Sequence, residues 1–358
     1  MTRLNLNTRL LVVFGILLAG TFVAESFFRK PQQLDYAGEM NASVGLTKTW
    51  FSLIDQLKKD RGVKSDVPSN VTYSYMLGDE WSEITTTLGS LEAKETSTNP
   101  DFSALTVRLL HEAKISKGDK VGVALSGSFP SLSIAVLAAL QTMGIDAVVM
   151  SSAGASTYGA NQPEVTWMDM ETKLIKSGGM KYKSCLVSIG AGEDAGSGLS
   201  DEGIQRIRQA ATRNEVQLFI PETLSKSMEK RAGLFQSAKI SLLINIGGSQ
   251  TMLGNCPHST SIPNGLHAKI ASCRDDSRGL IARMNEQGIP FIQLLDIKNL
   301  AGQYGMAVSP GINYAESTNL YSTTRSEKPV LALILFLCLT PVYFLGQRLK
   351  LLNSQTTI

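Results

Sequence analysis

The chain has 358 residues, a formal net charge of +3 at pH 7 and 43% hydrophobic side chains. Residues 31–328 hold 28 basic and 30 acidic side chains, so the small positive excess comes from the two ends of the chain. A nearly neutral segment lacks the basic surface that nucleic-acid binding needs, so nucleic acid is not the expected partner. The segment is long enough for one large or two smaller hydrophobic cores.

Two charge-free apolar runs lie near the ends of the chain, at Leu10–Ala24 and Val330–Leu345. Basic residues flank both runs, and the residues before the first run include no acid. This pattern is typical of a signal anchor whose N-terminus stays in the cytoplasm. We therefore predict transmembrane segments within residues 1–30 and 329–358, a lipid bilayer as partner, and a main domain outside the cytoplasm. A cleaved signal peptide and a buried C-terminal helix are the respective alternatives.

Residues 31–100 are expected to form a helical stalk and connector. Apolar residues recur at helical spacing over Met40–Lys59, and a polar stretch rich in Ser, Thr, Asn and Asp follows.

Residues 101–328 alternate short β-branched apolar runs with helical patterns, which is typical of βαβ units. We predict a doubly wound α/β domain with a mostly parallel sheet. The expected helices include Ser131–Gly144, Asp201–Thr212 and Ser225–Gln236. The expected strands are Lys120–Leu125, Asp146–Met150, Ser184–Ile189, Val216–Ile220, Ile240–Ile246 and Pro290–Leu295.

Four of these strands run directly into loops of small residues. The carboxyl ends of parallel strands share one edge of the sheet, and small residues let backbone amides approach a ligand there. The alternative is that the glycines merely form the turns between strands and helices. The residues predicted to bind a ligand are Ser126, Gly127, Ser128, Ser151, Ser152, Gly190, Gly192, Glu193, Asp194, Asn245, Gly247 and Gly248.

Ser126 and Ser128 are candidate nucleophiles, because a sharp strand-to-helix turn exposes a hydroxyl beside free amides. The turn lacks the G-x-S-x-G pattern and the chain has only 3 histidines, so helix capping or ligand binding by these hydroxyls is the alternative. Glu193 and Asp194 are the second candidates, since paired carboxylates can act as acid and base or hold a cation. Asp169 is better explained as part of the first turn of a helix.

The chain has 4 cysteines. Cys185 and Cys338 lie in apolar runs and are expected to be buried hydrophobic residues. Cys256 and Cys273 are expected either to form a disulfide or to remain unpaired thiols. A zinc site that combines them with His258 and His267 matches no common ligand spacing, so we predict no metal. The sequence leaves the cofactor open.

Several segments taken together resemble the poly-γ-glutamate system protein family. They are Ser126–Gly144, Ser151–Asn161, Thr166–Glu171, Gly190–Gly198 and Asn245–Gly248. Members of this family are membrane-anchored bacterial proteins associated with the synthesis and export of a γ-linked glutamate polymer. The resemblance covers nearly the whole chain, and the family offers no catalytic residues to transfer.

The resemblance implies an accessory component of a poly-γ-glutamate capsule or secretion system. Its α/β domain would bind the polymer, a precursor or a partner subunit, and other subunits of the system would be its partners. Two alternatives stay open, a hydrolase or transferase acting on γ-glutamyl amides and a non-catalytic scaffold.

Overall fold

The computed structural model describes residues 12–16, 19–20, 30–256, 262–271, 273, 275, 277–311, 317, 319–325, 334–337, 339–341, 343–344 and 346–348. The chain divides into two compact units. One is Asp35–Tyr321, and the other combines Met1–Leu34 with Ser322–Ile358. Each unit is described by itself.

The predicted membrane spans fall in the second unit, and parts of both lie outside the described residues. In the parts that the structure does describe, no helix combines the length and the apolar character needed to cross a bilayer. This finding contradicts the predicted transmembrane segments and the location based on them. The charge-free runs contain 15 and 16 residues, whereas a spanning helix needs about 20.

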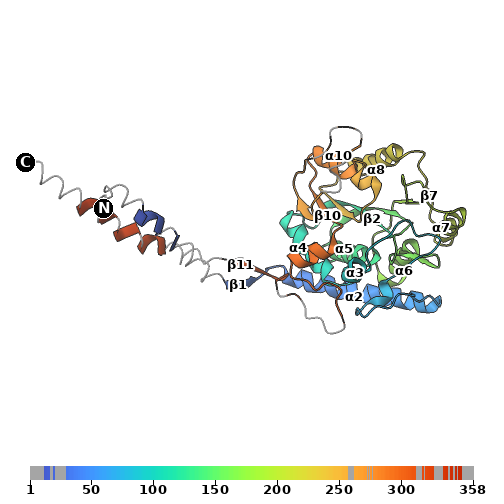
Figure 1. Cartoon of the computed structure of the whole chain (residues 1–358), viewed down its shortest axis with the longest axis horizontal. Helices are drawn as coiled ribbons and strands as arrows, with labels where there is room; N and C mark the ends of the chain where they lie inside the picture. Colours follow the sequence, from blue (N-terminus) through green and yellow to red (C-terminus); the bar gives the residue numbers. More distant parts are fainter. Residues whose placement is uncertain are drawn as a thin grey trace, which may run out of the picture. The chain divides into compact units, whose positions relative to one another are not determined.

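A short antiparallel strand pair is the described β structure of the second unit. Strand β1 (Lys30–Gln33) pairs with β11 (Ser322–Arg325), with Lys30 opposite Arg325 and Gln33 opposite Ser322 (Figure 1).

The Asp35–Tyr321 unit is built on a seven-stranded sheet in the order β7-β6-β3-β2-β8-β10-β9. The first six strands in this order are parallel, and each overlaps a run predicted to be a strand. Strand β9 is antiparallel to β10 and was not predicted. The strands are β2 (Lys120–Ser126), β3 (Asp146–Ser152), β6 (Leu186–Ser188), β7 (Leu218–Phe219), β8 (Leu242–Ile246), β9 (Gly265–His267) and β10 (Phe291–Leu294).

The remaining elements of this unit are mostly helices, and the α/β class is confirmed. They are α2 (Ala37–Asp60), η1 (Ser74–Met76), α3 (Leu91–Ser97), α4 (Asp101–Glu112), α5 (Pro130–Met143), β4 (Asn161–Gln162), β5 (Val165–Thr166), α6 (Trp167–Gly178), α7 (Asp201–Arg213), α8 (Leu224–Ala238), α9 (Gln250–Leu253), α10 (Leu280–Glu286) and α11 (Ile297–Gln303).

Helices cover both faces of the sheet. Leu186 packs in one cluster with Phe235 of α8 and Met284 of α10. Its neighbour Val187 packs in another cluster with Ile207 of α7. Because successive side chains of a strand point to opposite faces, these two clusters form separate layers of the core.

Helix α5 is apolar on all sides and therefore needs cover beyond the sheet. Pro130 begins it, and Gly144 ends it with a positive φ of 66°. Helices α2 and α4 both pack against α5. Residues 31–100 thus contribute α2 to the packing of the α/β unit.

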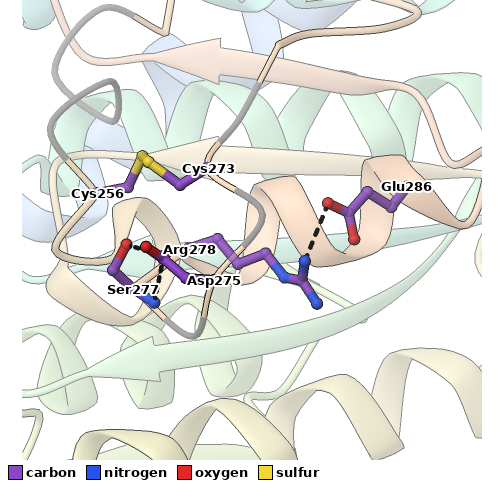
Figure 2. The surroundings of a disulfide bond; sticks show 6 residues. All are labelled: Cys256, Cys273, Asp275, Ser277, Arg278 and Glu286. Atoms are coloured by element: carbon purple, nitrogen blue, oxygen red, sulfur yellow. Dashed lines mark hydrogen bonds and ion pairs between the residues drawn. A yellow bond between two sulfur atoms is a disulfide. The ribbon is translucent and has the colours of Figure 1, made fainter.

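Cys256 and Cys273 form a disulfide, with their Cα atoms 6.0 Å apart (Figure 2). The bond settles the alternative that the sequence left open, and it occupies both thiols that a zinc site would have needed. His258 lies outside the described residues. Cys185 is exposed, so its predicted burial was wrong, and Cys338 lies outside the described residues.

Candidate ligand-binding site

A cavity of about 470 Å³ lies at the carboxyl edge of the sheet, and we call it the edge cavity. It is lined by the turns after β2, β3, β6 and β8, by residues 86–90, which lead into α3, and by Ala93 and Lys94 of α3. The predicted residues that line it are Ser126, Ser128, Ser152, Gly190, Gly192, Asp194 and Gly248. The other predicted residues, which are not in this lining, are Gly127, Ser151, Glu193, Asn245 and Gly247.

The edge cavity lies where the order of the strands reverses. From β2, the chain continues through β3, β6 and β7 on one side, and then returns to β8 and β10 on the other. Ser126 and Ser128 follow β2, and Gly248 follows β8. In open α/β sheets, ligands bind at such a reversal, outside the carboxyl ends of the strands.

Hydroxyl groups hold the turn after β2 against the loop after β3. Ser126 Oγ accepts a hydrogen bond from the Ser128 amide at 3.1 Å and donates one to Ser128 Oγ at 3.0 Å. Ser128 Oγ also accepts from the Ser156 amide at 2.9 Å. A Cβ atom on Gly127 would lie 3.0 Å from the carbonyl oxygen of Ala153. Gly127 therefore allows the two loops to approach closely, although it does not line the cavity.

Lys94 is a residue of this site that the sequence did not indicate. It lies on α3, which starts at the N-cap Ser90, and its side chain is buried although it lines the edge cavity. Its Nζ donates to Ser156 Oγ at 2.8 Å and to the carbonyl oxygen of Ser128. The same Nζ lies 3.7 Å from the centre of the Phe129 ring.

Burial lowers the pKa of Lys94 to about 7, because a charged ammonium loses its hydration inside the protein. Among the ion pairs of the described residues, none includes Lys94. Its acidic neighbours Glu92 and Glu95 make this segment resemble an exposed helix. The sequence pattern therefore does not predict that Lys94 is buried.

Asp194 and Glu193 have different surroundings. Asp194 is buried, and its carboxylate accepts from Ser188 Oγ and Ser227 Oγ, both at 2.6 Å, and from Arg231 at 3.0 Å. Glu193 is exposed, and its amide donates to Gln250 Oε1 at 2.8 Å. The two residues therefore hold the loop after β6, one against α8 and the other against α9.

Two further predicted residues support the strand ends. Ser151 Oγ donates to Ser184 Oγ at 2.9 Å. The Asn245 amide nitrogen donates to the carbonyl oxygen of Gly247 and to Gln293 Oε1, both at 2.8 Å. These contacts shape the turns that line the cavity.

Asp169 has a structural role at the start of α6, as its position in the first turn indicated. It forms a capping box with Thr166, and its carboxylate also accepts from Arg61, Arg213 and Asn214. Burial acts to raise the pKa of Asp169, but the hydrogen bonds, led by that from Arg213, hold it below its ordinary value.

Metal ligands do not gather in the described part of the chain. Within it, no group of three or more His, Cys, Asp or Glu side chains is placed to hold a metal ion. Of the two histidines that the structure describes, His111 contacts Glu39 at 2.7 Å and His267 contacts the carbonyl oxygen of Asn264 at 3.0 Å. Neither is among the residues that line the edge cavity.

In comparisons with known proteins, no protein-family model, curated protein or solved structure matches this chain.

Proposed function

We propose that the Asp35–Tyr321 unit binds a small polar ligand in the edge cavity and that this ligand is a γ-linked glutamate chain or one of its building blocks. The observation that carries the proposal is the position of the cavity, at the reversal of strand order where α/β sheets bind ligands. Its volume of about 470 Å³ lies within the range of small-molecule sites.

The chemistry of the lining supports a ligand rich in amide and carboxylate groups. Nine serines and threonines line the cavity, and each hydroxyl can both donate and accept a hydrogen bond. Amide N–H groups, carbonyl oxygens and carboxylates can all be satisfied by such a lining. The resemblance of the sequence to the poly-γ-glutamate system proteins is what selects γ-linked glutamate from this class.

The protein would then act as an accessory component of poly-γ-glutamate synthesis or export. It would hold the polymer or a precursor for partner subunits of the same system. If the protein were only a scaffold, the edge cavity would bind no ligand.

Calorimetric titration of the full chain with a γ-linked glutamate oligomer tests the proposal, with an α-linked oligomer for comparison. Gly248 lines the cavity without a positive φ, and an added Cβ would lie 3.2 Å from the flexible Leu295 side chain. Gly248→Val should therefore narrow the cavity and weaken binding by about 10-fold or more. Gly45→Val on α2, where a Cβ meets nothing within 4 Å, is the control. Unchanged affinity in a folded Gly248→Val protein would place the ligand elsewhere.

A further inference from the structure

We propose that Ser156 and Lys94 cleave an amide bond of the ligand in the edge cavity, with Ser156 as the nucleophile and Lys94 as its general base. This inference rests on the proposed function, since it assigns a reaction to the ligand bound there. Ser156 is not one of the serines that the strand-to-helix turn singled out in the sequence.

The distance between the two groups meets the first requirement of such a pair. Ser156 Oγ lies 2.8 Å from Lys94 Nζ, within reach for proton transfer, and both residues line the cavity. Serine is a weak nucleophile until a neighbouring base accepts its proton. The contact between Ser156 and Lys94 supplies that base.

The surroundings favour the unprotonated form of Lys94. Its buried amine has a pKa of about 7, so a large fraction is neutral at physiological pH. When Lys94 loses its proton, its amine can still donate one N–H to the carbonyl oxygen of Ser128. The contact in which Nζ donates to Ser156 Oγ then reverses, and the Ser156 hydroxyl donates to the amine lone pair. Hydrogen bonds from the Ser156 amide to Ser128 Oγ and from the Gly159 amide to the Ser156 carbonyl oxygen fix the backbone of the nucleophile.

Lys58 is a second buried lysine, and it serves as a comparison because it is outside the edge cavity lining. Its Nζ donates to the carbonyl oxygen of Leu77 at 2.7 Å. Burial lowers the pKa of Lys58 to about 8, while the nearby charge of Asp79 acts to raise it. Lys58 is not among the residues that line the edge cavity. It is therefore the matched control for Lys94.

The reaction balances with water as the only added reactant. Ser156 Oγ attacks the amide carbon as its proton moves to Lys94; the C–N bond then breaks, and the proton passes to the leaving amine. Water next gives a proton to Lys94 and attacks the resulting ester, and this proton returns to Ser156 as the carboxylic acid leaves. The products are one acid and one amine, and both side chains regain their starting forms.

Two measurements on the full chain test the pair. One is covalent labelling by a serine-reactive fluorophosphonate, with the modified residue located by mass spectrometry. The other is release of the amine from a γ-glutamyl anilide. We expect the label on Ser156 and a rate of each reaction that rises with pH through about 7. Lys94→Met should lower both rates by roughly 10²–10⁴-fold, whereas Lys58→Met should leave them unchanged.

Several results would overturn the assignment. They are a label on Ser126 or Ser128 instead of Ser156, Lys94→Met reacting at the normal rate, and wild-type protein that binds the oligomer but neither takes the label nor releases amine. The site of labelling and the pH profile are measured on the wild-type protein, so they test the assignment even if a variant fails to fold. Ser156→Ala should still bind the oligomer. Binding without reaction rejects this inference alone, and reaction without oligomer binding rejects the proposed ligand alone.

Discussion

The carboxylate of Asp194 lies 3.0 Å from the guanidinium of Arg231, and each side chain is only 4% exposed. This ion pair connects the loop after β6 to α8. Ala191, Glu193 and Asp194 in that loop all have positive φ values, which cost free energy in residues other than glycine. The buried pair and its serine partners therefore hold a strained wall of the edge cavity.

Replacing Asp194 by Asn should lower the free energy of unfolding by about 3–5 kcal/mol, because Arg231 would remain buried without its counter-charge. Asn tolerates a positive φ, so the change tests the charge and spares the backbone. The control is Glu202→Gln, which breaks an exposed pair with Arg206 and should cost less than about 1 kcal/mol. Urea unfolding measures the free energy of unfolding of both variants. If both lose the same amount, the buried pair does not hold the loop after β6 in place.

Lys94 should make the protein more stable as the pH rises. The folded state holds the Lys94 proton only up to a pKa of about 7, whereas the unfolded chain holds it up to about 10.5. The unfolded state therefore binds more protons between these values, and the free energy of unfolding should increase by up to about 1.4 kcal/mol per pH unit.

Lys94→Met should remove this increase, and a comparison of urea unfolding at pH 7, 8 and 9 measures the difference between the two proteins. Lys58 adds a similar dependence to both, so it cancels in the comparison. Parallel curves for the two proteins would contradict an unprotonated Lys94 and, with it, its role as a base.

The disulfide should stabilise the segment between α9 and α10. Replacing Cys256 and Cys273 together by Ser should lower the free energy of unfolding by about 3 kcal/mol, since the bond closes a loop with a sequence separation of 17. Cys185→Ser removes the exposed free thiol and should leave stability unchanged. Thermal unfolding of the three proteins, with and without reductant, checks this. If reductant does not change the melting temperature of the wild-type protein, the disulfide does not stabilise the fold.

Asp169 should contribute to the acid sensitivity of the fold. Its folded pKa lies below the ordinary value of 3.8, so its stabilising effect is complete above that value and declines as the pH falls through the folded pKa. Asp169→Asn should lower stability at pH 6 and flatten the decline below about pH 4. If the variant and the wild-type protein lose stability in parallel below pH 4, the ion cluster around Asp169 is not responsible.

The parallel strands were predictable because each is a short apolar run between turn residues. Strand β9 was not, because Gly265–His267 has no apolar run and pairs only through the edge of β10. The membrane prediction relied on hydropathy in runs that were short for a span.

The site was predictable as an edge of the sheet but not as a set of side chains. Small residues after the strands pointed to the edge of the sheet at which the cavity lies, since local sequence determines where strands end. The role of Asp194 depends on Arg231, which lies 37 positions further along the chain. Lys94 comes from a helix that precedes the first strand of the sheet, and only tertiary packing brings its amine to Ser156.

The pairing of β1 with β11 determines how tension on the chain would act. Lys30 and Arg325 form the outermost pair, and Gln33 and Ser322 the innermost. A pull that separates residues 30 and 325 loads one backbone pair at a time, so the strands peel apart from the outside inward. Such a ladder yields to a small force, and its rupture would precede any mechanical load on residues 35–321.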